Sequence, residues 1–376
     1  MLRRIFDGIW SALAASLLLL SLNALAQSST LRTEVVASGL EHPWGLAFID
    51  GGRMLVSERP GRLRVVSADG MLSRPLAGVP KVDAVGQGGL LDVITDRDFA
   101  RNRSLYFCFA EPATRGRGNS TALATARLSA DASRLEQVKI LFSQKPKVQS
   151  RLHFGCRIVQ AADGSLFLAL GDRFHHMDDA QTLDNHHGKV VRIKTDGSPH
   201  PENPYLRRRN ALPEIWSLGH RNPQGATLGP DGRLWTLEHG PQGGDEINRP
   251  EAGKNYGWPI ITHGENYGGG QIGAGITAKP GMEPPLHHWT PSIAPSGMAF
   301  INSPRYGKAW QGNLLVGSLK FRYLARLTMD GSRVLSEEML LTDLGQRVRD
   351  VRQGPDGYIY LLTDEADGQL LRLRER

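Results

Sequence analysis

The sequence predicts an all-β fold, and two observations favour this fold class. Short apolar runs alternate with glycine-containing turns along most of the chain, whereas no segment shows a long helical period. Several turns read Asp-Gly or Pro-Asp-Gly, for example at residues 163–164 and 355–357. Such turns favour tight hairpins because glycine adopts a positive φ without a steric clash. We therefore expect strands throughout, with helix as a minor component.

Six segments of the chain share one outline. Each has an apolar strand, a turn, a second apolar strand that ends in a polar or acidic residue, and then a longer excursion. The six segments begin near Pro43, Gly89, His153, Asn222, Ser296 and Arg349. Their spacing of about 45 to 75 residues is typical of propeller blades with insertions in some loops. The sequence therefore predicts a six-bladed β-propeller, with a two-sheet sandwich plus a second domain as the alternative.

The segment at residues 32–37 precedes the first unit and is also strand-like. We expect it to close the ring by pairing with the last blade, because closure removes exposed strand edges. Each blade of a propeller starts with its inner strand, so residues at the starts of different units meet at one axial mouth. The candidates for this meeting point are His153, Arg221 with Asn222, Lys320 and Arg349.

The first residues are typical of a secretory signal peptide. Arg3 and Arg4 precede an apolar run at residues 9–22, which is short for a bilayer span, and an Ala-Leu-Ala sequence then ends at Ala26. We expect a signal peptide at residues 1–26, a propeller domain at residues 27–376, and a periplasmic or secreted protein with no stable membrane anchor. An uncleaved anchor is the alternative.

The charge of the chain does not indicate a nucleic-acid partner. Without residues 1–26 the formal net charge falls from +7 to +6, with 43 basic against 37 acidic residues, and this charge is spread along the chain. The one local cluster, at residues 207–209, is interpreted as a solvated loop. The balance suits solubility and the attraction of anions.

The chain has two cysteines, Cys108 and Cys156. Export would permit a disulfide between them. Both lie in apolar strand-like runs, where a free cysteine behaves as a small hydrophobe. We expect two buried free thiols, with a disulfide as the alternative.

Two neighbouring segments concentrate charged and amide side chains among glycine and proline. Residues 215–225 contain a guanidinium and amides, and residues 238–248 contain three carboxylates. Carboxylates and bare backbone carbonyls are the oxygen donors that calcium prefers, and a guanidinium suits an anion. The two segments therefore indicate a site for a charged cofactor.

Several long motifs occur in a fixed order along nearly the whole mature chain. They are Gly86 to Asp92, His153-Phe154-Gly155, Gly219 to Gly225, Glu238 to Asn248, Asn255 to Pro259, Ala294 to Gly297 and Arg347 to Asp350. With these motifs the chain resembles the soluble aldose sugar dehydrogenases, relatives of soluble glucose dehydrogenase that use pyrroloquinoline quinone and calcium. The resemblance implies a quinoprotein oxidoreductase that converts aldose sugars to lactones by hydride transfer from the anomeric carbon to the quinone. It also implies a separate, unidentified electron acceptor.

The resemblance assigns catalytic roles to two residues. His153 is expected to be the general base that removes the proton of the anomeric hydroxyl, which suits an imidazole because its ordinary pKa lies near working pH. Arg221 is expected to stabilise the oxyanion that develops on the quinone, with Asn222 beside it. Without the resemblance, a structural histidine and a loop salt bridge would be the simpler interpretations.

Further cofactor contacts follow from the same resemblance. Lys320, Arg347 and Arg349 are expected to bind the carboxylates of the quinone, and a solvated strand face is the alternative for the arginine pair. Additional expected contacts are Gln87, Tyr267 and Ser292. The glycine-rich loop around Gln87 lacks the Lys-Ser/Thr of a P-loop.

The resemblance also implies calcium ligands. The backbone carbonyls of Gly240 and Pro241 are expected to hold the calcium ion that contacts the quinone, and Glu246 with Tyr256 matches a further calcium position. A second cluster of possible metal ligands contains Asp172, His175, His176, Asp178 and Asp179, and the neighbouring pair His186-His187 is interpreted as surface. A transition-metal site is the less favoured interpretation of this cluster, because the cluster lacks the ligand spacing typical of zinc.

Two other functions stay open from the sequence. One is a calcium-dependent propeller lactonase or hydrolase in which His153 activates water. The other is a non-catalytic carbohydrate-binding propeller. The glycine-rich stretch at residues 261–288 is expected to shape the sugar entrance.

Overall fold

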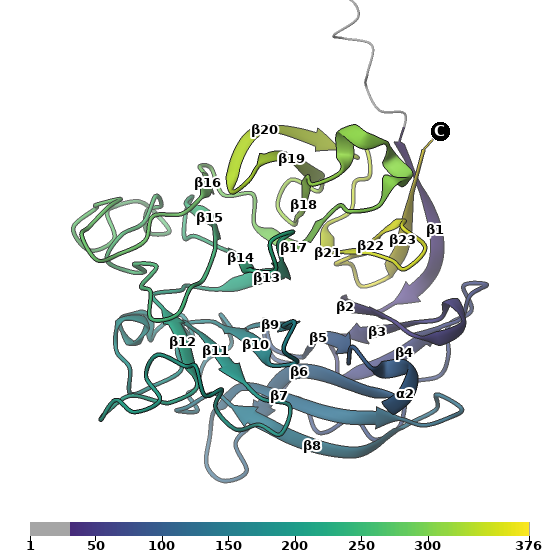
Figure 1. Ribbon diagram of the computed structural model, residues 1–376, viewed down its shortest axis with the longest axis horizontal. Coiled ribbons are helices and arrows are strands. Elements are labelled where there is room, and N and C mark those ends of the chain that lie inside the picture. Colours follow the sequence, from purple (N-terminus) through teal and green to yellow (C-terminus); the bar gives the residue numbers. More distant parts are fainter. Residues whose placement is uncertain (1–30, 376) are drawn as a thin grey trace, which may run out of the picture.

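The computed structural model describes residues 31–375 and arranges them as a ring of six antiparallel sheets (Figure 1). The innermost strands of the sheets contact one another around the ring and face its centre. The six-bladed β-propeller is therefore confirmed. The expected signal peptide at residues 1–26 lies outside the described residues. No helix within residues 31–375 has the length and apolar character needed to cross a membrane.

The first three sheets follow the chain from the inner to the outer strand. The first sheet holds β2 (Pro43–Phe48), β3 (Met54–Glu58) and β4 (Arg62–Val66). The second holds β5 (Leu90–Thr95), β6 (Ser104–Pro112), β7 (Asn119–Leu128) and β8 (Leu135–Ser143). The third holds β9 (Gly155–Gln160), β10 (Leu166–Leu170), β11 (Lys189–Ile193) and β12 (Ile215–Leu218).

The remaining sheets repeat this order. The fourth holds β13 (Pro223–Leu228), β14 (Leu234–Glu238), β15 (Asp245–Asn248) and β16 (His287–Trp289). The fifth holds β17 (Pro295–Phe300), β18 (Leu314–Ser318), β19 (Leu324–Asp330) and β20 (Arg333–Leu340). The sixth holds β21 (Val348–Gln353), β22 (Ile359–Thr363), β23 (Gly368–Glu375) and β1 (Leu31–Leu40). Short helical turns are α2 (Phe99–Asn102), η1 (Asp50–Gly52), η2 (Met177–Gln181), η3 (Pro304–Tyr306) and η4 (Lys308–Trp310).

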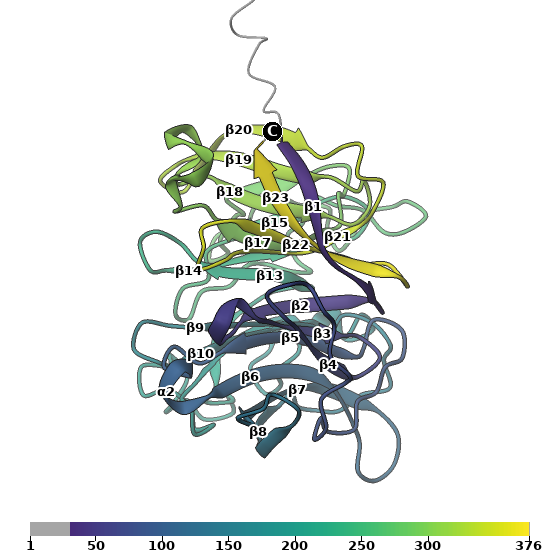
Figure 2. The same ribbon diagram turned by 90° about the vertical axis from the view of Figure 1, so that its right-hand side faces the viewer.

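The ring is closed by the first and last strands that the structure describes. β1 pairs with β23 in antiparallel register from Leu31 opposite Glu375 to Leu40 opposite Gly368, and the two strands lie side by side in Figure 2. Glu34 of β1 forms ion pairs with two arginines of β23, Arg372 at 2.9 Å and Arg374 at 2.6 Å. The expected closure by residues 32–37 is confirmed.

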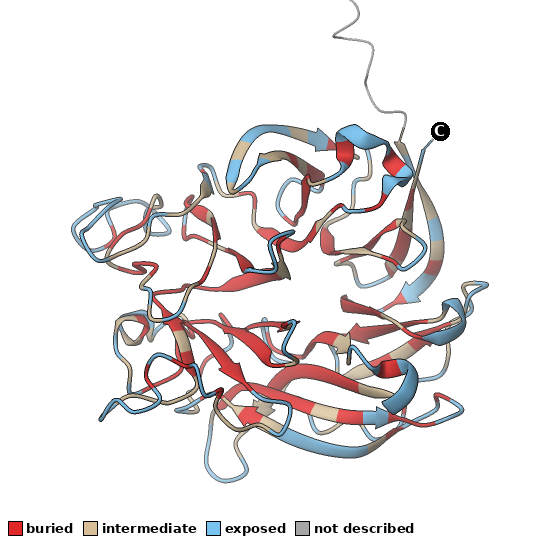
Figure 3. Ribbon diagram, viewed as in Figure 1, coloured by how far each residue is buried: buried red, intermediate tan, exposed pale blue. Residues whose placement is uncertain are grey.

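The hydrophobic core lies between neighbouring sheets. In β3, Leu55 packs in a cluster with Phe107 of the second sheet, whereas Val56 packs with Leu362 of the sixth. Successive side chains of a strand point to opposite faces, so a sheet that is covered on both faces needs an unbroken apolar run. Figure 3 shows this burial along the inner strands, with exposed residues at the rim.

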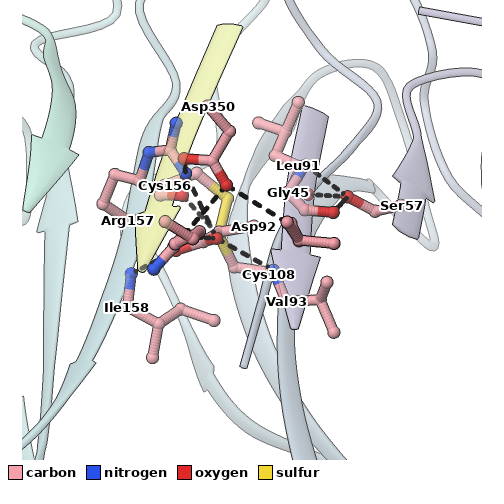
Figure 4. Close-up of polar contacts among 12 residues, drawn as sticks. Gly45, Ser57, Leu91, Asp92, Val93, Cys108, Cys156, Arg157, Ile158 and Asp350 are labelled. Carbon is pink, nitrogen blue, oxygen red and sulfur yellow. Dashed lines mark hydrogen bonds and ion pairs between the residues drawn. A yellow bond between two sulfur atoms is a disulfide. The ribbon is translucent and has the colours of Figure 1, made fainter. Parts of the chain in front are cut away.

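The two cysteines form a disulfide, so the expectation of free thiols is wrong. Cys108 of β6 is bonded to Cys156 of β9, with their Cα atoms 5.9 Å apart (Figure 4). Both residues lie in buried strands, as expected. The sequence does not reveal that these two strands belong to neighbouring blades with facing side chains. The disulfide therefore joins the second sheet to the third.

A buried ion-pair network also links the inner strands (Figure 4). Nη1 of Arg157 in β9 lies 3.3 Å from Asp92 of β5 and 2.8 Å from Asp350 of β21. The same guanidinium lies 4.1 Å from the ring centroid of Trp44 in β2. All three charged side chains are almost completely buried. Because a buried charge needs a partner, this network fixes the mutual position of the strands that carry the site.

Candidate active site

A cavity of about 310 Å³ lies beside the start of β9. It brings together four residues of the expected site, His153, Arg221, Pro241 and Tyr267. Tyr267 belongs to the glycine-rich stretch 261–288 and is 64% exposed. The other lining residues are Asp172, Phe174, His175, Met177, Asp178, Trp258, Asn266 and Ile272.

His153 is held from two directions. Its backbone N–H donates to Oε1 of Gln87 at 2.8 Å, and its Nδ1 lies 2.7 Å from Oδ1 of Asp172. Asp172 also accepts hydrogen bonds from the Phe174 backbone N–H at 2.8 Å and the Trp258 indole at 2.7 Å. The Phe174 N–H and the Trp258 indole are certain donors and the pKa of Asp172 is lowered, so Asp172 is an ionised carboxylate. A carboxylate only accepts, so Nδ1 of His153 carries the proton. Nε2 is therefore the ring nitrogen that offers a lone pair to a ligand.

The surroundings of His153 favour a neutral imidazole. Burial lowers the pKa of His153, the hydrogen bond to Asp172 raises it, and the positive charge of Arg221 lowers it, so that the pKa lies below its ordinary value. For Asp172, burial raises the pKa but the hydrogen bond to His153 lowers it, and the net shift is downward. A neutral imidazole beside an ionised carboxylate can accept a proton at neutral pH.

Arg221 lies at the end of a buried loop between β12 and β13. Its Nη1 donates to the backbone carbonyls of His239 at 3.0 Å and Gly240 at 2.6 Å. Its guanidinium lies 5.1 Å from the ring centroid of Trp258. Its Nε is buried and has no hydrogen-bond partner within residues 31–375. Arg221 is thus a fixed positive charge with an unused donor.

A second cavity, of about 160 Å³, lies among the inner strands. It brings together four further residues of the expected site, Gln87, Asn222, Arg347 and Arg349. It is also lined by Trp44, Arg59, Leu91, Phe154, Gly155, Gln224, His239, Leu319 and Asp364. Its charged lining consists of three arginines and one aspartate, so the cavity suits an anion.

Arg349 is held in this second cavity by polar contacts. It donates to Oδ2 of Asp364 at 2.5 Å and to Oε1 of Gln224 at 3.1 Å, and Arg347 reaches the same Asp364 oxygen at 3.1 Å. Burial raises the pKa of Asp364, but the charges and hydrogen bonds of Arg349 and Arg347 lower it by more, so the net shift of the pKa is downward. The Nε of Arg349 is buried without a partner among the described residues.

Two expected contacts lie outside the lining of both cavities. Lys320 is exposed, and its backbone N–H donates to the carbonyl of Ile293 at 3.2 Å. Ser292 donates to Asp245, with its Oγ 2.7 Å from Oδ2. In the structure, Ser292 therefore contacts a carboxylate of β15.

The expected calcium ligands fall into two groups. The Gly240 carbonyl accepts from Arg221, and Pro241 lines the His153 cavity. Glu246 of β15 lies directly opposite Glu238 of β14, and both carboxylates accept from the Asn248 amide, at 3.2 and 3.0 Å. Burial raises the pKa of Glu246 well above its ordinary value, and the charge of Glu238 raises it further.

Tyr256 is connected to this carboxylate pair through His220. Its ring stacks on His220 with centroids 5.0 Å apart, and His220 Nδ1 lies 3.0 Å from Oε1 of Glu238. The Tyr256 hydroxyl donates to the carbonyl of Arg249 at 2.5 Å. The two carboxylates of Glu238 and Glu246 thus form a partly buried acidic pair that a cation would stabilise.

The second cluster of histidines and aspartates separates into three parts. Asp172 orients His153, and His175 and Asp178 line the cavity. His176 and Asp179 lie instead beside His187. The interpretation of the pair His186-His187 as surface residues is wrong, because both are buried, at 1% and 0% exposure. His187 lies two residues before the buried strand β11, and the sequence shows no periodic pattern for the loop that covers it.

Sequence reasoning missed several residues that build the site. The sequence groups Asp172 with the second cluster and Trp258 with the motif at residues 255–259, but no role was expected for either. Asp172 contacts His153 across the β9–β10 hairpin, and Trp258 reaches Asp172 from the loop between β15 and β16. His239 lines the second cavity, and its Nε2 lies 2.6 Å from the carbonyl of Pro295. Burial lowers the pKa of His239 to about 3, so this imidazole is neutral. The dipeptide Glu238-His239 at the end of β14 was the available signal.

Comparisons with known proteins identify a family and similar proteins. The family model described as glucose/sorbosone dehydrogenase matches residues 40–372. The chain is 45% identical over 363 residues to aldose sugar dehydrogenase YliI of Escherichia coli, which covers 96% of this chain and 97% of that protein.

Two solved structures share the fold. The apo-form of the soluble aldose sugar dehydrogenase of Escherichia coli matches with a TM-score of 0.89 and 45% identity over 92% of this chain and 100% of that chain. The PQQ-bound aldose sugar dehydrogenase of Streptomyces coelicolor matches with a TM-score of 0.73 and 26% identity over 93% of this chain and 100% of that chain.

Proposed function

The chain belongs to the glucose/sorbosone dehydrogenase family, and on this premise we propose that it is a quinoprotein that oxidises aldose sugars at the anomeric carbon to lactones. The observation that carries the proposal is the pairing of His153 with Asp172 in the cavity that Arg221 also lines. This pairing supplies a neutral base with a fixed tautomer beside a fixed positive charge.

The second cavity suits pyrroloquinoline quinone, which carries several carboxylates. Arg347 and Arg349 would hold those carboxylates, with Gln87 and Asn222 as neutral contacts. The unpartnered Nε of Arg349 supports this fit, because a buried donor without an acceptor is costly and an anionic ligand in this cavity would satisfy it. Lys320, Ser292 and Tyr267 are proposed as outer contacts.

Calcium is proposed as the second cofactor. Glu246 and Glu238 form a carboxylate pair with a raised Glu246 pKa, which supports a cation there together with Tyr256. The carbonyls of Gly240 and Pro241 are proposed for the ion at the quinone. When bound, the quinone supplies the hydride acceptor and calcium supplies Lewis-acid polarisation.

The residues of the chain perform the proton chemistry. Nε2 of His153 accepts the proton of the anomeric hydroxyl while the hydride leaves the same carbon, so that the sugar becomes a lactone. Asp172 holds the proton on Nδ1 and stabilises the imidazolium that forms. Arg221 stabilises the negative charge that develops on the acceptor. The electrons then pass to a separate acceptor.

We propose that the protein works in the periplasm or outside the cell. The Cys108–Cys156 disulfide supports an oxidising compartment, and the features of residues 1–26 support cleavage of a signal peptide.

Reconstitution tests the proposal. The mature protein, purified without cofactor, is mixed with pyrroloquinoline quinone, calcium or both, and sugar-dependent dye reduction is recorded for hexoses, pentoses and disaccharides. We expect activity only with both additions. Turnover of lactones with calcium alone would identify a hydrolase, and sugar binding without any redox change would identify a carbohydrate-binding propeller; either result overturns the proposal.

A further inference from the structure

Three potential ligand atoms gather beside η2, on residues that line neither of the two cavities. His176, Asp179 and His187 each offer one nitrogen or oxygen, and these atoms all lie within 4.8 Å of one another. His176 and Asp179 come from the loop and turn that follow Asp172, whereas His187 comes from the residue pair before β11. The cluster is separate from the acidic pair of Glu238 and Glu246.

The hydrogen bonds of His187 are typical of a metal-binding histidine. Its side chain is fully buried, its Nε2 lies 3.1 Å from the Pro146 carbonyl, and its Nδ1 lies 2.8 Å from Oδ2 of Asp179. Both partners are acceptors, so a singly protonated ring satisfies only one of them. With Nε2–H donated to the Pro146 carbonyl, Nδ1 keeps a lone pair for a metal ion that Asp179 would share, and such a carbonyl contact to the second ring nitrogen is common in metal sites.

His176 completes the cluster from the solvent side. Its Nδ1 lies 3.5 Å from the same Asp179 oxygen, and its ring centroid lies 5.1 Å from that of His187. The side chains of His176 and Asp179 are each 37% exposed. The position between the three groups is therefore open to water on one side and closed by His187 on the other.

The neighbouring backbone is already fixed. Nζ of Lys189 donates to the carbonyls of Asp179 at 2.8 Å, Ala180 at 3.2 Å and His187 at 2.6 Å. This lysine ties η2 to the start of β11 without occupying a ligand atom of the cluster. By contrast, both ring nitrogens of the adjacent His186 have structural partners, the Lys145 N–H and the Glu214 carboxylate.

We propose that His176, Asp179 and His187 bind one divalent transition-metal ion of the zinc or cobalt type, with water in the remaining position. Two imidazoles and one carboxylate suit such an ion, whereas calcium prefers oxygen ligands alone. The inference does not rest on the proposed sugar oxidation. Met177 and Asp178 of η2 also line the His153 cavity. The bound ion would therefore hold this part of the cavity wall against the residues that precede β11.

Cobalt absorption and thermal unfolding test the site. The mature, quinone-free protein is stripped with EDTA and titrated with Co²⁺, and the visible d–d bands and the unfolding temperature are recorded. We expect saturation at one ion per chain, a rise in unfolding temperature, and displacement by Zn²⁺ but not by excess Ca²⁺. The variants His187→Ala and His176→Ala should each weaken Co²⁺ binding by at least about tenfold.

The matched control is His200→Ala. His200 also pairs with a carboxylate, with Nε2 3.2 Å from Asp163, but has no second imidazole in its group. This variant should bind Co²⁺ as the wild type does. If His187→Ala fails to fold by circular dichroism, the partly exposed His176→Ala decides the question. Wild-type protein without d–d bands, or binding unchanged in His176→Ala, would overturn the proposal.

Discussion

Nδ1 of His153 and Oδ1 of Asp172 lie 2.7 Å apart, because the antiparallel pairing of β9 with β10 brings the residues before β9 beside those after β10. The contact settles the tautomer of the imidazole, because the ionised carboxylate only accepts. It also makes the base strength of His153 depend on Asp172, which lines the same cavity.

Replacing His153 with alanine should remove most sugar-dependent turnover. A general base contributes about 10²- to 10⁴-fold to the rate. Among the described residues that line this cavity, no other histidine pairs with a carboxylate and could replace His153 as the base. Steady-state kinetics of the reconstituted variant measure the loss, and a quinone titration should show nearly unchanged affinity. Unchanged turnover would remove His153 from the base role.

Asp172→Asn should lower turnover by on the order of 10²-fold without loss of quinone binding, because an amide no longer fixes the proton on Nδ1. The wild-type kcat/KM should fall with acid only below the ordinary histidine value of 6.5, since the pKa of His153 is lowered. Removing Asp172 removes a contact that raises this pKa, so the acid limb should shift to still lower pH. A purely structural role would leave the limb in place.

Arg349→Ala should weaken quinone affinity by about 10- to 100-fold, as expected for loss of a charged hydrogen bond of about 1.5 to 3 kcal/mol. The variant also leaves Asp364 with Arg347 as its remaining cationic partner in the described structure. Fluorescence or absorbance titration measures the affinity. Arg333→Ala, at an exposed arginine of β20, is the control and should match the wild type.

Glu246→Gln should change stability in opposite directions with and without calcium. A carboxyl whose pKa is raised on folding stabilises the fold below its ordinary value of 4.5, and this contribution is lost as pH rises. In EDTA the variant should therefore unfold at a higher temperature than wild type at pH 8, with little difference near pH 4. The rise in unfolding temperature on adding calcium should shrink. An identical calcium response in both proteins would contradict the proposed ligand role.

Replacing Cys108 and Cys156 together with alanine should destabilise the protein by up to about 4 kcal/mol, because the 48-residue loop is no longer closed in the unfolded chain. Denaturant unfolding compares the double variant with the wild type, with and without reductant. Reductant should lower the stability of the wild type alone. Mass spectrometry of the non-reduced protein reports the bond directly, and two free thiols there would refute the pairing.

The blades could be predicted from the sequence because their signals are local. The six expected starts lie within two residues of the inner strands, as with Gly89 for β5 and Arg349 for β21. An apolar run and a glycine turn need no distant information, and the closing strand follows from the need to cover an edge.

Contacts between blades could not be predicted in this way. The disulfide depends on which strands of neighbouring sheets face each other. The contacts of Trp258 with Asp172 and of His187 with Pro146 depend on which loops meet. The order of the motifs identified His153 and Arg221 as candidates. It did not separate Asp172, which contacts His153, from the nearby His176 and Asp179, which group with His187.

The pairing of β1 with β23 has a consequence for biosynthesis. Glu34 leaves the ribosome 338 residues before its partner Arg372, so the sixth blade stays incomplete until β23 has been translated. A nonsense mutation anywhere before Gly368 would leave both terminal edges of the ring unpaired. Newly made chains therefore need protection from aggregation until their last strand emerges.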